Sequence, residues 1–370
     1  MRGTKMLGRA GAVTVAMVSG MAFGTAHPHT NANRDAGAAL HATAAEAAPA
    51  SLACAEVRDR VGTLEGRITP NACAFMKRQI TFGETPTGTP PQPGEVGHPR
   101  VAAYLDIFDP EATLWEAGGD PQRGHAVIGN SIVGSLRLVP DLRYRGTEVV
   151  ADGAVVMFGQ WNEVTIKGHK VGYPQIARNV LSDDGKTIQA RRYYDRYTVF
   201  RSAAPELRNL FEGVADTAPD DMGQDVSTGP TADAGRGPGP RPFRAGDVTA
   251  RLAAWNTEDV DTLVDGTGHG RLTAPGLAAP LKTADGKAAY LRRLFDHADV
   301  QLKPGQVAFG RTNTFVEWHG TVTSPKGAKV PFGIVERFGP AGEWELSFDT
   351  LPLIAKQAEI DAMFRRLAQP

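Results

Sequence analysis

The stretch that decides the fold is ARRYYDRYTVF, residues 190–200. Its alternating charged and aromatic side chains are typical of a β-strand, with Asp195 placed among the tyrosines. Alternation gives two opposite faces, with Arg191, Tyr193, Asp195 and Tyr197 on one and Arg192 and Tyr194 on the other. The aspartate therefore either faces a cavity and takes part in chemistry, or pairs with an arginine and only fixes the strand register.

The same order of predicted elements occurs twice in the chain, first helices and then strands joined by hairpin turns. SFD at 347–349 corresponds to YYD at 193–195, and this makes Asp349 the counterpart of Asp195. Other proposed counterparts are Trp161 with Trp318, Ile176 with Ile334, and Arg178 with Glu336. This order predicts an α+β fold with two units, each built on one curled antiparallel sheet.

Several segments have helical periodicity. In the first unit a helix is expected over 52–68, where apolar residues follow helical spacing, and others over 101–108 and 124–140. In the second unit helices are expected within 248–264 and 285–298, and an amphipathic helix over 356–369. Residues 27–50 and 214–246 lack apolar periodicity and are interpreted as a flexible lead-in and a linker, which leaves units at 52–213 and 247–366.

The first residues have the order of a secretory signal peptide, namely a basic start, the apolar run AGAVTVAMVSGMAF and small residues up to position 26. That run is shorter than the ~20 residues that span a bilayer, so residues 1–26 are interpreted as a cleaved leader. Cys54 and Cys73 are the only cysteines, and they are expected to form a disulfide in an oxidising compartment, with two buried free thiols as the alternative. The mature protein is therefore expected to be secreted, with no membrane segment after removal of the leader.

Charge and motifs exclude several function classes. The chain has 40 basic and 41 acidic residues, so charge gives no reason to expect nucleic-acid binding. Metal-ligand spacing, a phosphate-binding glycine loop and a nucleophile elbow are all absent from the sequence. A function without a cofactor is expected, with a hydrophobic small molecule as partner.

Four stretches carry a family resemblance: YLDIFDPEATLW from 104, GHAVI from 124, DDGKTIQARRYYD from 183 and AAWNTEDVDTL from 253. They resemble the SnoaL-like polyketide-cyclase branch of the nuclear-transport-factor-2-like superfamily, and the likeness covers nearly all of both units. It implies two tandem cone-shaped domains, each a curved sheet wrapped around helices with an apolar pocket inside. Members of the family include cyclases, epoxide hydrolases, an isomerase and a dehydratase, as well as modules that only bind.

The resemblance also implies site residues, because the terminal aspartate of the family faces into the cone. It points to Asp195 and Tyr193 as catalytic in the first unit, and to Asp349 and Glu336 as an acid–base pair in the second. The expected binding residues are Tyr104, Asp106, Tyr197, Arg178 and Ser347. For Tyr104 the alternative is a core position, and for Asp195 it is pairing with Arg178 or Arg191. Trp161 and Trp318 are expected to pack against helices, and His319 has no assigned role.

Two functions remain open at this point. The first is an exported, cofactor-independent enzyme for cyclisation, epoxide opening or isomerisation of a polyketide-like or terpenoid-like molecule. The second is an exported, non-catalytic binding module for an apolar ligand or a protein partner. The enzyme requires a desolvated Asp195 or Asp349 beside a second polar group, whereas the binding module predicts an apolar pocket and aspartates neutralised by arginines. In either case the units are expected to pair through their outer sheet faces, within one chain or in a homo-oligomer.

Overall fold

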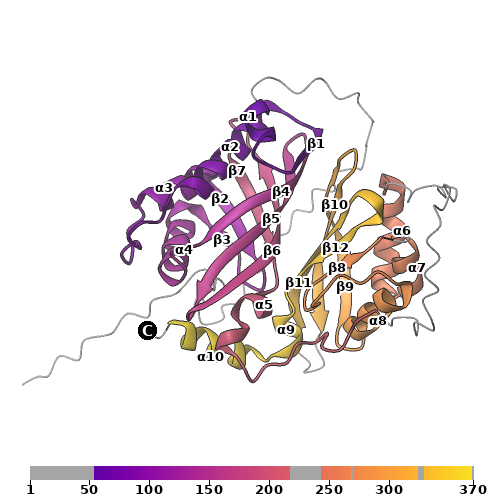
Figure 1. Ribbon diagram of the computed structural model, residues 1–370. Helices are drawn as coiled ribbons and strands as arrows, with labels where there is room; N and C mark the ends of the chain where they lie inside the picture. Colours follow the sequence, from indigo (N-terminus) through magenta and orange to yellow (C-terminus); the bar gives the residue numbers. More distant parts are fainter. Residues whose placement is uncertain (1–53, 217–242, 268–269, 324–328, 369–370) are drawn as a thin grey trace, which may run out of the picture.

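The computed structural model describes residues 54–216, 243–267, 270–323 and 329–368. It contains two curved sheets, and the helices of each unit cover the inner face of its sheet, while the helix-free outer faces of the two sheets lie against each other (Figure 1). The predicted leader, the lead-in at 27–50 and most of the predicted linker lie outside the described residues. The predicted α+β fold with two curved sheets is confirmed, although each sheet contains parallel strand pairing besides the antiparallel pairs expected.

The first unit is the seven-stranded sheet with its helices. Its strands are β1 (Thr63–Arg67), β2 (Phe108–Glu116), β3 (Gln122–Arg123), β4 (Arg143–Asp152), β5 (Val155–Ile166), β6 (His169–Leu181) and β7 (Thr187–Tyr193). Its helices are α1 (Ala55–Arg58), α2 (Pro70–Glu84), α3 (Pro99–Asp106), α4 (Gly124–Leu138) and α5 (Arg196–Phe200), followed by the 3-10 turn η3 (Arg201–Ala203).

The second unit is the five-stranded sheet with its helices. Its strands are β8 (Leu272–Thr273), β9 (Asp299–Phe309), β10 (Thr314–Thr323), β11 (Lys329–Phe338) and β12 (Trp344–Ser347). Its helices are α6 (Ala245–Asn256), α7 (Val260–Asp265), α8 (Ala284–Phe295), the 3-10 turn η4 (Pro340–Gly342), α9 (Leu351–Ile354) and α10 (Gln357–Ala368).

The start of the first unit differs from the prediction. Among the described residues of the segment expected to be a helix, only Ala55–Arg58 is α-helical, and Thr63–Arg67 forms a strand parallel to β4. The long helix begins later, where the Thr69 hydroxyl accepts a hydrogen bond from the amide of Ala72 and Pro70 fills the first turn. Both residue types favour a helix start, so this signal was present in the sequence. The predicted disulfide is present, with Cys54 at the start of α1 and Cys73 in α2.

The central strands of the two sheets follow one order. The first unit runs β4-β5-β6-β7-β2 and the second runs β9-β10-β11-β12-β8, and in both the last pair is parallel. Each sheet also has an irregularity between its first two strands in this order, between Gly146 and Val149 in β4 and between Val316 and Trp318 in β10. Such bulges bend a strand, and here they lie at corresponding points of both sheets.

The strand registers correct the counterparts proposed from the sequence. Tyr193 pairs with Ile176, and Ser347 pairs with Val335, so Ile176 corresponds to Val335 and not to Ile334. By the same count Arg178 corresponds to Arg337, and not to Glu336. A slip of one residue moves every side chain to the opposite face of a sheet. Glu336 consequently points into its own unit, whereas Arg178 points toward the other unit.

The tryptophan pair is affected by the same slip. Because Ile176 corresponds to Val335, Pro174 corresponds to Gly333. Trp161 pairs with Pro174 and His319 pairs with Gly333, so Trp161 is the counterpart of His319. Trp318 is fully buried in the second core, as expected, but Trp161 is 36% exposed on the outer face of β5. The prediction that both tryptophans pack against helices is therefore wrong for Trp161.

The segment that follows each sheet packs into the other unit. Leu210 and Phe211, beyond β7, belong to the second hydrophobic core, where Phe211 stacks on Tyr290 with ring centroids 3.9 Å apart. Helix α10, beyond β12, places Met363 and Phe364 in the first core. The boundaries predicted at 213 and 247 thus separate the sheets, but each core also contains residues from beyond the other sheet.

The outer faces of the two sheets form a third, smaller core. It joins Val150, Met157, Ile176 and Tyr193 of the first unit to Ala308, Phe315 and Val335 of the second. All seven side chains are at most 1% exposed. Burial of this apolar surface, together with the exchanged segments, joins the two units within one chain.

Candidate functional site

Asp195 lies just beyond β7, at the contact between the units. Its carboxylate accepts hydrogen bonds from the hydroxyl and amide of Thr350, at 2.6 and 3.0 Å. It also caps α5, accepting from the amides of Tyr197 and Thr198 and from the hydroxyl of Thr198. Burial raises the pKa of this carboxyl, as does the nearby charge of Asp349, while the hydroxyl groups act to lower it.

Asp349 makes the reciprocal contact. Its carboxylate accepts from the amide of Arg196 at 3.1 Å and pairs with the guanidinium of Arg196 at 2.7–2.8 Å. Each aspartate therefore binds the residue that follows the aspartate of the other unit. The equivalence of YYD and SFD read from the sequence matches their positions at the ends of corresponding strands.

These contacts place both aspartates at the junction. Neither lines the two pockets described below. Asp349 is neutralised by an arginine, which is the arrangement expected of a binding module, whereas Asp195 is desolvated beside hydroxyl groups. A catalytic role for either aspartate stays a prediction.

Glu336 lies at the centre of the second unit. Four donors surround its carboxylate: the guanidinium of Arg251 at 2.6 Å and the indole N–H groups of Trp255, Trp318 (2.8 Å) and Trp344 (3.0 Å). Glu336 and the three indoles are at most 1% exposed. Glu336 and Asp349 point to opposite sides of the sheet, so the structure does not bring the expected acid–base pair together.

Tyr193 and Arg178 point away from the helix-covered interior of the first unit and toward the second unit. Tyr193 donates a hydrogen bond to Glu317 of the second unit, and Arg178 pairs with the same carboxylate at 3.0 Å. Arg191 contacts it at 3.4 Å. Burial acts to raise the pKa of Glu317, but the two arginines and the tyrosine hydroxyl lower it to about 2. The arginines considered as partners of Asp195 are thus both bound to Glu317.

The remaining predicted binding residues do not converge. Tyr104 lies in the first core between Phe82 and Phe108, and burial raises its pKa to about 12. Asp106 is on the surface and pairs with Arg78 and Lys186. Tyr197 packs in the first core, and the Ser347 hydroxyl donates to the carbonyl of Tyr193 across the junction.

A pocket of about 320 Å³ lies in the first unit between α2 and strands β4 and β5. Val61, Met76, Ile80 and Phe158 form its apolar walls, and Arg60, Glu84 and Arg145 form a charged rim. Gln79 lines it and is only 4% exposed, and its Nε2 has no hydrogen-bond partner among the described residues. An apolar pocket was expected inside the unit, but its lining residues were not, because α2 supplies much of the lining and was not predicted.

The described residues lack two other kinds of site. They contain no cluster of three or more histidine, cysteine, aspartate or glutamate side chains that could hold a metal ion. Within the same part of the chain, helices of the length and hydropathy required to cross a membrane are not found.

Solved structures similar to this one match about a third of the chain. They include TerC co-crystallised with polyporic acid (16% identity, 36% of this chain and 97% of that chain, TM-score 0.30). Another is a protein with a ketosteroid isomerase-like fold from Catenulispora acidiphila in complex with trimethylamine (16%, 34% and 90%, TM-score 0.29). A third is named as a SnoaL-like polyketide cyclase, from Jannaschia (14%, 34% and 88%, TM-score 0.27). No protein-family model matches the sequence, and neither does any curated protein.

Proposed function

We propose that this protein is an exported binding module whose first unit holds an apolar small molecule in the pocket beneath α2. The observation that carries the proposal is the combination of apolar walls with one buried, unpartnered amide donor, Gln79 Nε2. Ligand pockets are commonly apolar with a few polar groups that orient the ligand. A molecule that brings a carbonyl or ether oxygen to Gln79 would bury its apolar body and satisfy this donor.

The side chains around Gln79 hold its amide in one orientation. The Tyr144 hydroxyl donates to the Gln79 main-chain carbonyl and lies 3.3 Å from Gln79 Oε1. Burial raises the pKa of Tyr144, so this hydroxyl keeps its proton. Nε2 has no hydrogen-bond partner among the described residues, and it is the atom of the amide that is left for a ligand.

The aspartate contacts favour binding over turnover. Asp195 and Asp349 hold the two units together through Thr350 and Arg196, away from the pocket. The acid–base chemistry expected of them would require a substrate to reach their carboxylates. Asp195 is only 7% exposed in the folded chain, and Asp349 only 4%. Their geometry is therefore better accounted for by a structural role.

The decisive experiment is titration of the oxidised protein with β-ionone, an apolar terpenoid ketone, monitored by calorimetry. We expect saturable binding that Gln79→Leu weakens about tenfold, because the variant removes the unpaired side-chain amide donor of the pocket wall. Ile80→Trp should abolish binding by filling the cavity. The oxygen-free hydrocarbon p-cymene, used as the control ligand, should respond to Ile80→Trp but not to Gln79→Leu. Absence of saturable binding by both ligands would refute the proposal.

The proposal includes two features that rest on sequence patterns. One is that the units are tandem copies of one SnoaL-like domain, supported by the shared strand order and the two strand-end aspartates. In that case the second copy, whose interior is occupied by Glu336, Arg251 and three tryptophans, serves as a support for the first.

The other feature is export, supported by the leader-like sequence at residues 1–26 and by the disulfide. Expression in a bacterial host tests export directly: a processed protein outside the cytoplasm supports it, and an unprocessed cytoplasmic one does not.

A further inference from the structure

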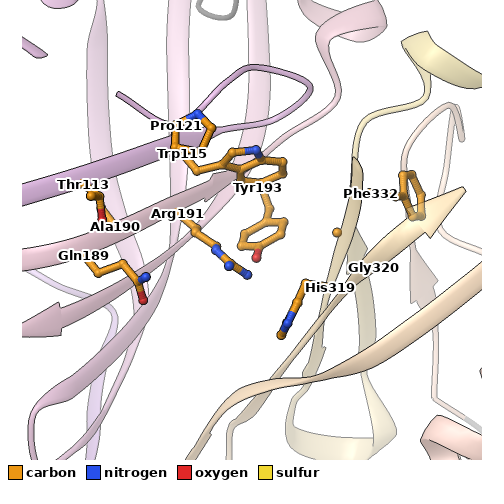
Figure 2. Close-up of a pocket in the computed structure, with 11 residues that line it drawn as sticks. Thr113, Trp115, Pro121, Gln189, Ala190, Arg191, Tyr193, His319, Gly320 and Phe332 are labelled. Atoms are coloured by element: carbon orange, nitrogen blue, oxygen red, sulfur yellow. The ribbon is translucent and has the colours of Figure 1, made fainter. Parts of the chain in front are cut away.

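A second pocket, of about 250 Å³, lies at the junction of the two units (Figure 2). β2 and β7 of the first unit supply Trp115, Gln189, Arg191 and Tyr193, and β10 and β11 of the second supply His319 and Phe332. In Figure 2 the Arg191 guanidinium and the Tyr193 hydroxyl point from the first unit toward the His319 ring of the second. Neither unit could form this pocket alone.

The charges at this pocket favour an anion. None of its eleven lining residues in the described chain is acidic. Arg178 and Arg191 share one carboxylate, Glu317, which leaves one positive charge in excess. Arg191 contacts Glu317 only at 3.4 Å and keeps a quarter of its side chain exposed. Most of its five N–H donors are therefore available to the pocket.

His319 adds a second polar group. Its Nδ1 is buried and has no hydrogen-bond partner among the described residues. Burial lowers the pKa of this imidazole, and the positive charge of Arg191 lowers it further, so the ring is neutral at pH 7. A neutral ring can donate one hydrogen bond to an anion without adding a second charge that would have to be desolvated.

The lining also has large flat apolar surfaces, beside the polar side chains of Thr113 and Gln189. Trp115 packs against Tyr193 with ring centroids 5.5 Å apart, and Phe332 and Pro121 lie at other sides of the pocket. Gly333 keeps this space open, because a Cβ atom there would come within 2.8 Å of the Tyr193 ring. Aromatic walls of this kind favour a planar ligand body.

We propose that the junction pocket is a binding site for a planar organic anion, a carboxylate on an aromatic ring system, bound by Arg191 and His319 and stacked near Trp115. Charge-assisted hydrogen bonds from a guanidinium to a carboxylate are short and about twice as strong as neutral ones. The site is separate from the apolar pocket beneath α2, and it does not depend on the function proposed there. Because residues of both units line it, its occupation would also stabilise the junction.

The test is titration of the oxidised full chain with 2-naphthoate and with its neutral analogue 2-naphthamide, followed by calorimetry and by amide and indole chemical shifts. We expect 2-naphthoate to bind at least tenfold more tightly than 2-naphthamide and to shift the signals of Trp115, Gly320 and Gly333. Arg191→Met should lower the affinity for 2-naphthoate about tenfold or more while leaving Arg178 as a partner for Glu317. His319→Phe should lower it by a smaller factor.

Two control variants make the outcome specific. Lys303→Met removes a nearby exposed charge that does not line the pocket, and it should change the affinity less than twofold. Ile80→Trp fills the other pocket and should leave 2-naphthoate binding unchanged. Equal binding of the acid and the amide, an Arg191→Met variant that is folded and binds normally, equal losses in Arg191→Met and Lys303→Met, or no saturable binding up to millimolar 2-naphthoate would each overturn the proposal.

Discussion

The interiors of the two units differ, although the two sheets share a strand order. Beneath α2 the first unit keeps a pocket walled by apolar side chains, with one amide donor unpaired. In the second unit the corresponding space between sheet and helices contains Glu336, bonded by Arg251 and three indoles. One topology thus supports either a cavity or a closed polar core, and side-chain volume and hydrogen bonding decide which.

The buried carboxylates of the two units fall into two groups, according to whether their partners lie in the same unit or in the other one. Glu336 has donors on every side and belongs to the core of one unit, whereas Glu317, Asp195 and Asp349 bind residues of the opposite unit. Glu336 therefore stabilises the core of the second unit, whereas the other three stabilise the contact between the two units. Four predictions sharpen this distinction, from the largest expected effect to the smallest.

Glu336→Leu should have the largest effect on stability. It leaves Arg251 charged and buried, with three indole N–H groups unpaired, and loss of one partner of such a pair costs about 3–5 kcal/mol. Chemical denaturation would measure this loss, with Glu111→Leu at an exposed position as the control. If Glu336→Leu were neutral, the second interior would not be the closed polar core described above.

The junction should respond strongly to pH through Glu317. Its folded pKa of about 2 lies below the ordinary value of 4.5, so its charged form stabilises the fold above pH 4.5. This contribution, about 3 kcal/mol for a shift of this size, is lost as the pH falls from 4.5 toward 2. Glu317→Gln should therefore be much less stable than the wild type at pH 6 and nearly equal to it near pH 2. A difference that stays constant with pH would contradict this assignment.

The two strand-end aspartates should differ from each other. Asp349→Asn leaves the buried guanidinium of Arg196 without its charge partner and should cost about 3 kcal/mol. Asp195→Asn keeps an acceptor for the neutral Thr350 hydroxyl and should cost about 1 kcal/mol. Thermal unfolding of both variants at pH 7 measures the difference. The reverse order would show that their partners, and with them the junction, have been assigned incorrectly.

Filling the first pocket should affect stability least. Ile80→Trp introduces bulk into a space that is already open, so we expect a change in unfolding free energy of about 1 kcal/mol or less, with loss of ligand binding. The same change at a closed position, Leu291→Trp in α8, should be far more costly because that side chain is fully buried in the second core. Equal costs at the two positions would remove the contrast between the interiors.

Much of the architecture could be predicted from the sequence. Hairpin turns, alternating strands and the repeated order of elements predicted two α+β units, and the two cysteines predicted the disulfide. The equivalence of YYD and SFD located two corresponding strand ends. These features are local or depend on short spacings, and such patterns are preserved in the folded chain.

Three other features were decided only by the tertiary structure. A slip of one residue in the proposed alignment assigned Glu336 and Arg178 to corresponding positions, although they face opposite sides of their sheets. Tyr193 was expected inside the cone, but packing of the two outer sheet faces turns it to the junction. Exchange of the segments beyond β7 and β12 completes each core with residues from the other end of the chain.

The physical reason is the same in all three cases. Periodicity shows which side chains share a face of a strand, but not which face meets a helix and which meets another sheet, because both environments are apolar and buried. The sequence of this protein determined its elements, their order and its disulfide. The partners of the carboxylates at the junction, and with them the junction pocket, depended on contacts between residues more than a hundred positions apart.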